Sequence, residues 1–224
     1  MKKLAFIFFV FCSLSSFGNK NYLRVKEDNF QKGQLSFGVR STISLFSQSG
    51  NYKGIGAGWQ VRYRIAEHLN SEWFADWIVT DIGGLGSRYD SHIGESMLIY
   101  PFSNPNAAGH FTPYVLGGFC GDYTKIEANI FYNDYTKTYS TNTKDRWSFA
   151  TQLGLGTHYN FTKWFDISFT TQYILHAGKD IHSDIETNSL GEKYLHIHQQ
   201  KGNNLEGHLF FTINANFVIA DIIK

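Results

Sequence analysis

Charged residues, proline, cysteine and long apolar runs are all scarce in this chain of 224 residues. Charged side chains make up 17% of it, below the quarter or so that is usual for soluble globular domains. The 20 basic and 19 acidic residues nearly balance, which leaves no electrostatic case for a nucleic-acid partner. No stretch after residue 18 approaches the roughly twenty apolar residues of a membrane-spanning helix, so that class is excluded.

Cysteine is limited to Cys12 and Cys120. Cys12 lies in an apolar run at residues 4–12 that follows two lysines and precedes small residues at 16–18. This is the layout of a secretory signal peptide, so we expect residues 1–18 to be cleaved. Cys120 then stands alone, which excludes an internal disulfide in the exported protein and favours a small apolar filler.

Aromatic residues are abundant, with 20 Phe, 13 Tyr and 5 Trp, and this composition excludes a disordered chain. Apolar and polar residues alternate with a period of two in successive segments, which is typical of β-strands with two different faces. We expect strands at 35–45, 55–65, 69–80, 92–102, 111–122, 149–159, 165–175 and 205–217. The fourth and fifth segments alternate less clearly, so their facing stays open.

The connections between these segments alternate in length. Those at 66–68, 103–110 and 162–164 are short, whereas those at 46–54, 81–91, 123–146 and 177–203 are longer. This pattern predicts an all-β fold, an eight-stranded antiparallel up-and-down transmembrane β-barrel, at residues 34–219. A soluble β-sandwich is disfavoured, because its loops would not sort by side. Residues 19–33 are expected to form an N-terminal periplasmic segment, and residues 220–224 a C-terminal tail.

The polar faces of the strands would fill the interior of such a barrel, which is just wide enough for side chains. The expected interior set is Arg40, Arg62, Arg64, Glu72, Asp76, Gln152, Gln172, Glu206 and His208. A three-residue turn at 66–68 would place Arg62 opposite Glu72, where opposite charges stabilise a sheet. A charge-paired plug is favoured over a gated conduit, because buried charges usually sit in pairs.

Aromatic residues would gather near one rim if the N-terminus lies in the periplasm. A girdle at the level of the lipid headgroups is typical of such barrels. The expected periplasmic girdle consists of Tyr63, Tyr100, Tyr114, Tyr159, Trp164 and Phe217.

The connection at 177–203 is rich in histidine, and the one at 123–146 is rich in tyrosine. His176, His182, His196 and His198 lie in or beside residues 177–203 and could bind a metal, although a solvated polar loop is favoured. No cofactor is expected. The tyrosines of residues 123–146 suggest a surface that recognises an extracellular ligand or protein, or strands that extend beyond the membrane.

Three motifs give the chain a family resemblance: Gly56-x-Gly58-x4-Tyr63, Pro113-Tyr114-Val115-Leu116-Gly117-Gly118 and Gly154-x-Gly156-x2-Tyr159. With them, the chain resembles the small eight-stranded outer-membrane barrels of the OmpA- and OmpW-like group. The low proline content suggests an AT-rich Gram-negative source, such as one of the Bacteroidota. These barrels usually end on an aromatic residue, whereas seven residues follow Phe217 here.

This resemblance implies an integral outer-membrane protein with a structural or interaction role. Its partners would be outer-membrane lipids, lipopolysaccharide and, during insertion, the barrel-assembly machinery. A narrow channel for small or hydrophobic solutes is the alternative.

The lipid A deacylases are similar barrels and offer an enzymatic alternative. Their His-x-Ser-Asn-Ala-Gly motif corresponds here to residues 173–178, where Tyr173 replaces the His and Leu175 replaces the Ser. Only Glu206 matches their downstream Glu. Without a nucleophile and its base there is no acyl transfer by that route, so we expect no enzyme activity.

Overall fold

The computed structural model describes residues 32–46, 52–102, 108–133, 135–178, 181–199 and 204–222. The expected signal peptide, residues 1–18, lies outside these ranges. Within the described residues, no helix has the length and apolar character needed to cross a membrane.

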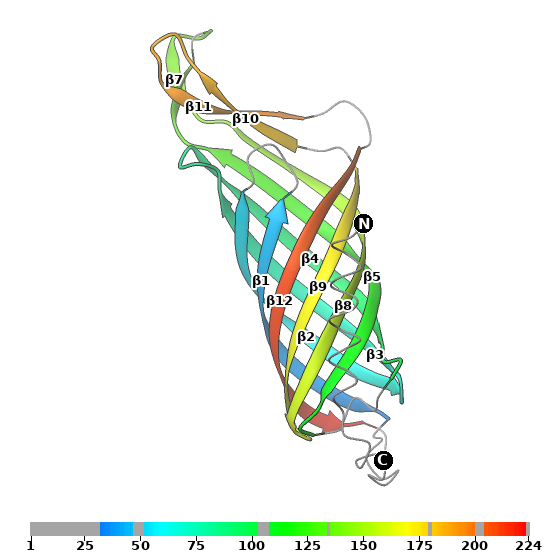
Figure 1. Cartoon of the computed structure of the whole chain (residues 1–224). Coiled ribbons are helices and arrows are strands. Elements are labelled where there is room, and N and C mark those ends of the chain that lie inside the picture. Colours follow the sequence, from blue (N-terminus) through cyan, green and yellow to red (C-terminus); the bar gives the residue numbers. More distant parts are fainter. Residues whose placement is uncertain are drawn as a thin grey trace, which may run out of the picture.

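Eight antiparallel strands close into a barrel in the order β1-β12-β9-β8-β5-β4-β3-β2 (Figure 1). Their bounds are Gln34–Phe46 (β1), Lys53–Ala66 (β2), Leu69–Asp81 (β3), Gly86–Ile99 (β4), Phe111–Ala128 (β5), Thr143–Thr162 (β8), Phe165–Gly178 (β9) and Asn204–Asp221 (β12). Each strand pairs with its neighbour along the barrel, and β1 pairs with β12 to complete the ring. The closed eight-stranded up-and-down barrel predicted from the alternating pattern is confirmed.

The two ends of the barrel differ. At one end, here called the turn end, short connections join β2 to β3 and β8 to β9. At the other, the loop end, β8 continues for six residues beyond its ladder with β9, from Phe149 to Thr143, and stays paired with β5 as far as Glu127 (Figure 1). Two hairpins continue this extension: β6 (Phe131–Asn133) with β7 (Thr138–Ser140), and β10 (Ile181–Thr187) with β11 (Lys193–Gln199).

The expected loops at 123–146 and 177–203 are therefore largely strand. Residues 123–128 and 143–146 continue the β5–β8 ladder, because backbone pairing persists after the apolar alternation has ended. The fourth strand begins at Gly86 and ends at Ile99, instead of spanning 92–102.

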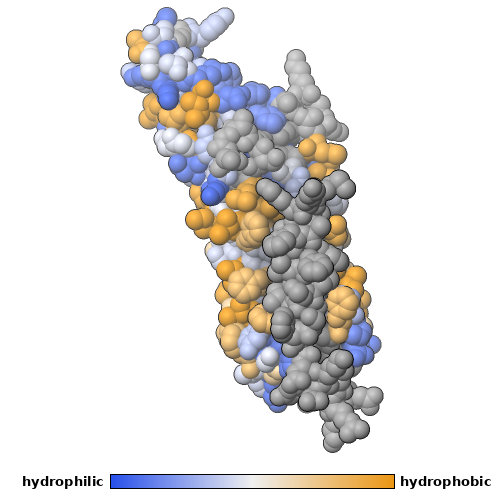
Figure 2. Space-filling model, viewed as in Figure 1, coloured by the Kyte–Doolittle hydropathy of each residue, from blue (hydrophilic) through white to orange (hydrophobic). Residues whose placement is uncertain are grey.

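The outer face of the barrel is apolar and its interior is polar. All five tryptophans are exposed on the outside. Figure 2 shows hydrophobic residues over the wall of the barrel and hydrophilic residues at the loop end. Such an inverted arrangement is what a barrel surrounded by lipid requires.

The height of the apolar wall can be measured along the outer face of β5. Outward residues run from Phe111 to Tyr123, and charged Lys125 and Glu127 follow. Tyr123 stacks on Trp147 of β8 with ring centroids 4.9 Å apart. Twelve residue steps at about 3.3 Å, inclined by about 40° to the axis, correspond to roughly 30 Å. This height matches the hydrocarbon core of a bilayer, about 30 Å.

A chain of aromatic rings encircles part of the turn end. Successive ring centroids of Phe111, Tyr159, Phe161, Phe165 and Phe217 lie 4.9, 4.7, 5.6 and 4.8 Å apart. Each of these rings is exposed or half-buried on the outer face. The interfacial girdle of outer-membrane barrels has this form.

The girdle prediction was wrong for two of its six residues. Tyr63, Tyr159, Trp164 and Phe217 lie on the outer face, but Tyr100 and Tyr114 are 0% and 3% exposed inside the barrel. The physical reason is the facing of β4 and β5, on which even-numbered residues point inward. Both hydroxyls find interior partners, His158 for Tyr100 and Thr170 for Tyr114.

The strand register that the sequence predicts for the second and third strands is confirmed. Arg62 lies directly opposite Glu72 in the β2–β3 pair. The last strand continues past Phe217 to Asp221, whose partner is Gln34 at the start of β1. The residues after Phe217 thus belong to the barrel wall as far as Asp221.

Candidate functional site

A network of ion pairs occupies the interior towards the turn end. Arg40 contacts Asp76 at 3.0 Å and Glu72 at 3.2 Å. Arg62 contacts Glu72 at 3.1 Å and Asp166 at 3.3 Å. The network joins β1, β2, β3 and β9, which include strands on opposite sides of the ring. Two arginines and three carboxylates hold one another, as buried charges require.

Amide and ring side chains extend this network to the mouth of the barrel. Asn216 donates to Asp166 at 2.7 Å, and Gln60 donates to Asn216 at 2.5 Å. A cavity of about 20 Å³, room for one water molecule, opens here beside Arg62 and Arg64. Asn70, Tyr100 and His158 also line this cavity.

Glycines allow this dense packing at specific points. A Cβ on Gly156 would lie 2.3 Å from the ring of Tyr114, so the ring occupies the space that any side chain would need. A Cβ on Gly58 would lie 2.3 Å from the carboxylate of Asp76. These two glycines therefore admit a tyrosine ring and a carboxylate.

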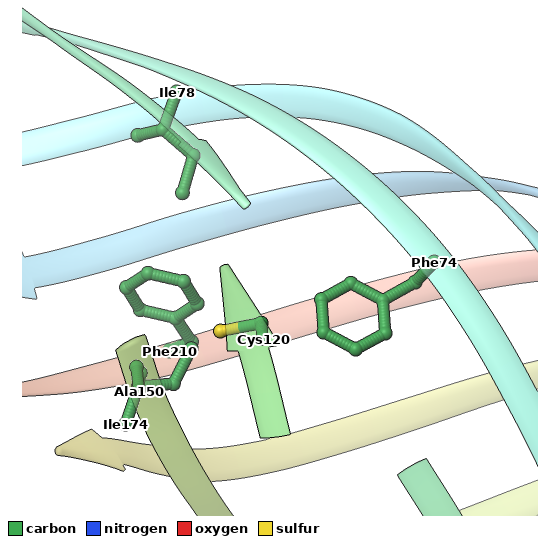
Figure 3. Close-up of a cluster of buried hydrophobic side chains, with 6 residues drawn as sticks. All are labelled: Phe74, Ile78, Cys120, Ala150, Ile174 and Phe210. Carbon is green, nitrogen blue, oxygen red and sulfur yellow. The ribbon is translucent and has the colours of Figure 1, made fainter. Parts of the chain in front are cut away.

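An apolar cluster lies above the ion-pair network. Six residues from β3, β5, β8, β9 and β12 project into one interior space (Figure 3): Phe74, Ile78, Cys120, Ala150, Ile174 and Phe210. The guanidinium of Arg40 lies 4.7 Å from the ring centroid of Phe74, on the turn-end side. The ring of His92 packs edge-on against Phe210 at 5.1 Å, on the loop-end side. The cluster therefore lies between two polar regions.

Histidines surround a buried aspartate on the loop-end side of this apolar cluster. Nε2 of His92 lies 3.2 Å from Oδ1 of Asp122, and Nδ1 of His176 lies 3.0 Å from Oδ2. His208 packs its ring 4.6 Å from that of His176. A single ligand atom from each of His92, Asp122 and His176 can be chosen so that all three lie within 4.8 Å of one another. These residue types could hold a metal ion.

Arginines balance the carboxylates next to these histidines. Arg88 donates from Nε to both oxygens of Asp90 at 3.0 Å. Arg146 approaches Asp122 at 4.0 Å. Sequence reasoning missed this region, because the weak alternation of the fourth and fifth segments hid His92, Asp90 and Asp122. The alternating polar residues at 88, 90 and 92 were the signal that could have found it.

The hairpin β10–β11 packs on the loop end through one apolar face. Its buried residues and those of β5 and the β3–β4 turn form one cluster: Ile82, Ile126, Ala128, Ile181, Leu195 and Ile197. The opposite face is exposed and carries Asp184, Glu186 and three histidines. The hydroxyl of Tyr194 donates to Glu186 at 2.5 Å, and this bond, with His196 at 2.9 Å, lowers the pKa of the Glu186 carboxyl.

The structure separates the histidines that the sequence grouped as a metal set. His176 is buried inside the barrel, whereas His182, His196 and His198 belong to the hairpin. The reason is that β9 extends to Gly178 and keeps His176 on its inward face. The rings of His182 and His198 stack at 5.8 Å, with His198 in turn 5.8 Å from His196.

The expected interior residues lie inside the barrel wherever their side chains are described. They are Arg40, Arg62, Arg64, Glu72, Asp76, Gln152, Gln172 and His208, all buried. Glu206 lies on β12, but its side chain is outside the described part of the structure. Asp166 and His158, which the sequence placed only on polar strand faces, are members of the same interior network.

Comparisons with known proteins identify the fold. No family model and no curated protein matches the chain. Among solved structures, a major outer-membrane protein of Thermus thermophilus is 10% identical with a TM-score of 0.53, over 83% of this chain and 99% of that one. Neisserial surface protein A is 11% identical with a TM-score of 0.52, over 83% and 96%.

A third solved structure has a lower score. Outer membrane protein W of E. coli is 18% identical with a TM-score of 0.41, over 84% of this chain and 99% of that one. The fold is that of the small eight-stranded outer-membrane β-barrels.

Proposed function

We propose that the protein is an integral outer-membrane barrel with a closed interior, and that it serves the cell envelope through its wall and its loop-end surface. Its outer face would contact membrane lipids and lipopolysaccharide, and the barrel-assembly machinery would insert it. The loop end would face the outside of the cell, since the shorter connections of such barrels are periplasmic.

The apolar cluster around Phe74 and Phe210 is the main evidence for a closed interior. Both side chains are at most 2% exposed, and both pack against charged or polar residues of the neighbouring layers. A hydrophobic constriction stops ions even where it leaves a gap, because water leaves an apolar passage. The ion pairs below it narrow the interior further.

Recordings from a planar bilayer test this proposal. The refolded wild-type barrel should give no discrete conductance steps. The double variant Phe74→Ala and Phe210→Ala removes two rings from the cluster and should give steps if the cluster closes the barrel. Wild-type steps that change size with Arg62→Leu would contradict a closed interior and support the channel alternative.

The loop-end extension supports a role in recognition. Exposed apolar and aromatic residues are present there as well as on the wall of the barrel: Ile130, Tyr135, Tyr139 and Leu190 are 62 to 100% exposed. Tyrosine offers a large contact area at a low cost in conformational entropy, which suits a surface that binds an external ligand or protein. The hairpins provide a folded platform, which reduces the ordering cost of binding.

An enzymatic role is not part of this proposal. Tyr173, at the position of the deacylase histidine, is half-exposed on the outer face of β9. Gln172, Ile174 and His176 point into the barrel nearby, and His176 contacts Asp122. Incubation with lipid A should leave its mass profile unchanged, and loss of an acyl chain would contradict this part of the proposal.

A further inference from the structure

We propose that the interior of the barrel binds one divalent transition-metal ion, such as Zn²⁺, through His92, Asp122 and His176. The site lies on the loop-end side of the apolar cluster and uses side chains from three strands, β4, β5 and β9. It is distinct from the histidines of the β10–β11 hairpin.

The separations of the three side chains fit a coordination sphere. Two ligand atoms bound to Zn²⁺ at about 2.1 Å in tetrahedral geometry lie about 3.4 Å apart. Nε2 of His92 lies 3.2 Å from Oδ1 of Asp122, close to this value, and Nδ1 of His176 lies 3.0 Å from the other oxygen, Oδ2, of the same carboxylate. The three ligand atoms lie within 4.8 Å of one another, so a small rotation of the rings would complete the set.

Five polar atoms of these three residues have no hydrogen-bond partner within the described structure. Both ring nitrogens of His92 and His176 lack hydrogen-bond partners there, as does Oδ1 of Asp122. The two short contacts therefore lack hydrogen-bond geometry, although the residues are at most 1% exposed. Buried polar groups without partners are costly, and a shared metal ion would satisfy one ring nitrogen of each histidine together with a carboxylate oxygen.

The surroundings orient the carboxylate as a ligand. Oδ2 of Asp122 accepts hydrogen bonds from Ser148 at 2.9 Å and from Thr124 at 3.3 Å. Metal-bound carboxylates are usually held in this way by outer hydrogen bonds. These bonds leave Oδ1 directed at His92, so the carboxylate is already positioned for coordination.

The residue types favour a transition metal over calcium or magnesium. Two imidazoles and one carboxylate suit zinc, copper, iron or nickel, whereas Ca²⁺ and Mg²⁺ prefer oxygen ligands. Three protein ligands also leave a coordination position for water, which is common in non-structural zinc sites.

Cobalt binding to the full chain tests the proposal. The protein is refolded in detergent with Co²⁺ and dialysed, after which bound metal is counted and the visible Co²⁺ spectrum recorded. Wild type should retain one ion per barrel. His92→Gln, His176→Gln and Asp122→Asn should each weaken retention by at least about tenfold, because each removes a direct ligand.

A matched control separates the interior site from the hairpin. The double variant His182→Gln and His198→Gln removes two half-buried histidines of the hairpin and should retain Co²⁺ as wild type does. Unheated electrophoretic mobility verifies that each variant has folded. A wild type without bound Co²⁺, or loss of Co²⁺ in the hairpin variant alone, would overturn the proposal. Equal retention in folded Asp122→Asn would also overturn it.

Discussion

Arg62 on β2 and Asp166 on β9 form an ion pair at 3.3 Å across the barrel interior, although 104 positions separate them in the sequence. These strands are not neighbours in the ring. The contact therefore depends on closure of the whole barrel, and Arg62 links Asp166 to Glu72, which Arg40 also contacts.

Replacement of this arginine should destabilise the barrel strongly. Arg62→Leu leaves Glu72 and Asp166 without their shared partner, so we expect a loss of about 3–5 kcal/mol in the free energy of unfolding. Urea unfolding in lipid vesicles measures this value. Val39→Ala, on the exposed outer face, provides a control with a small effect. An Arg62→Leu barrel as stable as wild type would show that the ion pairs are open to water.

Close packing at Gly156 gives a second prediction. The added methyl group of Gly156→Ala would meet the Tyr114 ring at 2.3 Å, so the ring must move, at a cost of about 1–3 kcal/mol. Gly121→Ala is the matched control, because the nearest atom to its Cβ is 3.9 Å away. Equal unfolding free energies for the two variants would mean that Tyr114 does not occupy the interior.

The apolar contact under the β10–β11 hairpin should control its attachment. Leu195 is 1% exposed against the β5 extension, so Leu195→Asp would bury a charge and detach the hairpin. Trypsin should then cleave after Lys193 at least about tenfold faster, while the barrel keeps its unheated gel mobility. Leu190→Asp, at the exposed tip, should not change the rate. A cleavage rate unaffected by Leu195→Asp would contradict the packing.

Glu186 gives the hairpin a pH dependence of known sign. The Tyr194 hydroxyl, followed by His196, lowers the pKa of this carboxyl in the folded hairpin. Its stabilising contribution is complete above the ordinary glutamate pKa of about 4.3 and is lost as the pH falls through the lower folded value. An NMR titration should give a pKa below the ordinary value, and Tyr194→Phe should raise it. An unchanged pKa in Tyr194→Phe would contradict the bond.

Sequence alone was sufficient where the alternation was strict. The strands that carry Arg40, Arg62 and Asp76 were expected within one or two residues of their observed bounds, and the register of Arg62 with Glu72 is the observed one. Alternation of apolar and polar residues with a period of two indicates that a segment is a strand. It also shows which of the two faces contacts lipid and which faces the interior.

The alternation failed at β4 and β5, where Ser91, Gly117 and Gly121 interrupt the apolar outer face. The inner face carries Gly94, Gly118 and the apolar Cys120, so there was little contrast between the two faces. Tyr100 and Tyr114 were consequently assigned to the outside, and the cluster around Asp122 was overlooked. Contacts across the barrel, such as Arg62 with Asp166, depend on closure and have no signal in a local pattern.

Fluorescence of the tryptophans tests the central account most directly. The five side chains, at positions 59, 73, 77, 147 and 164, are 42 to 74% exposed on the outer face of the barrel. In vesicles of lipids brominated along the acyl chains, their emission should be strongly quenched, and aqueous iodide should have little effect. Quenching by iodide without quenching by brominated lipid would place these side chains in water and contradict a membrane-spanning barrel.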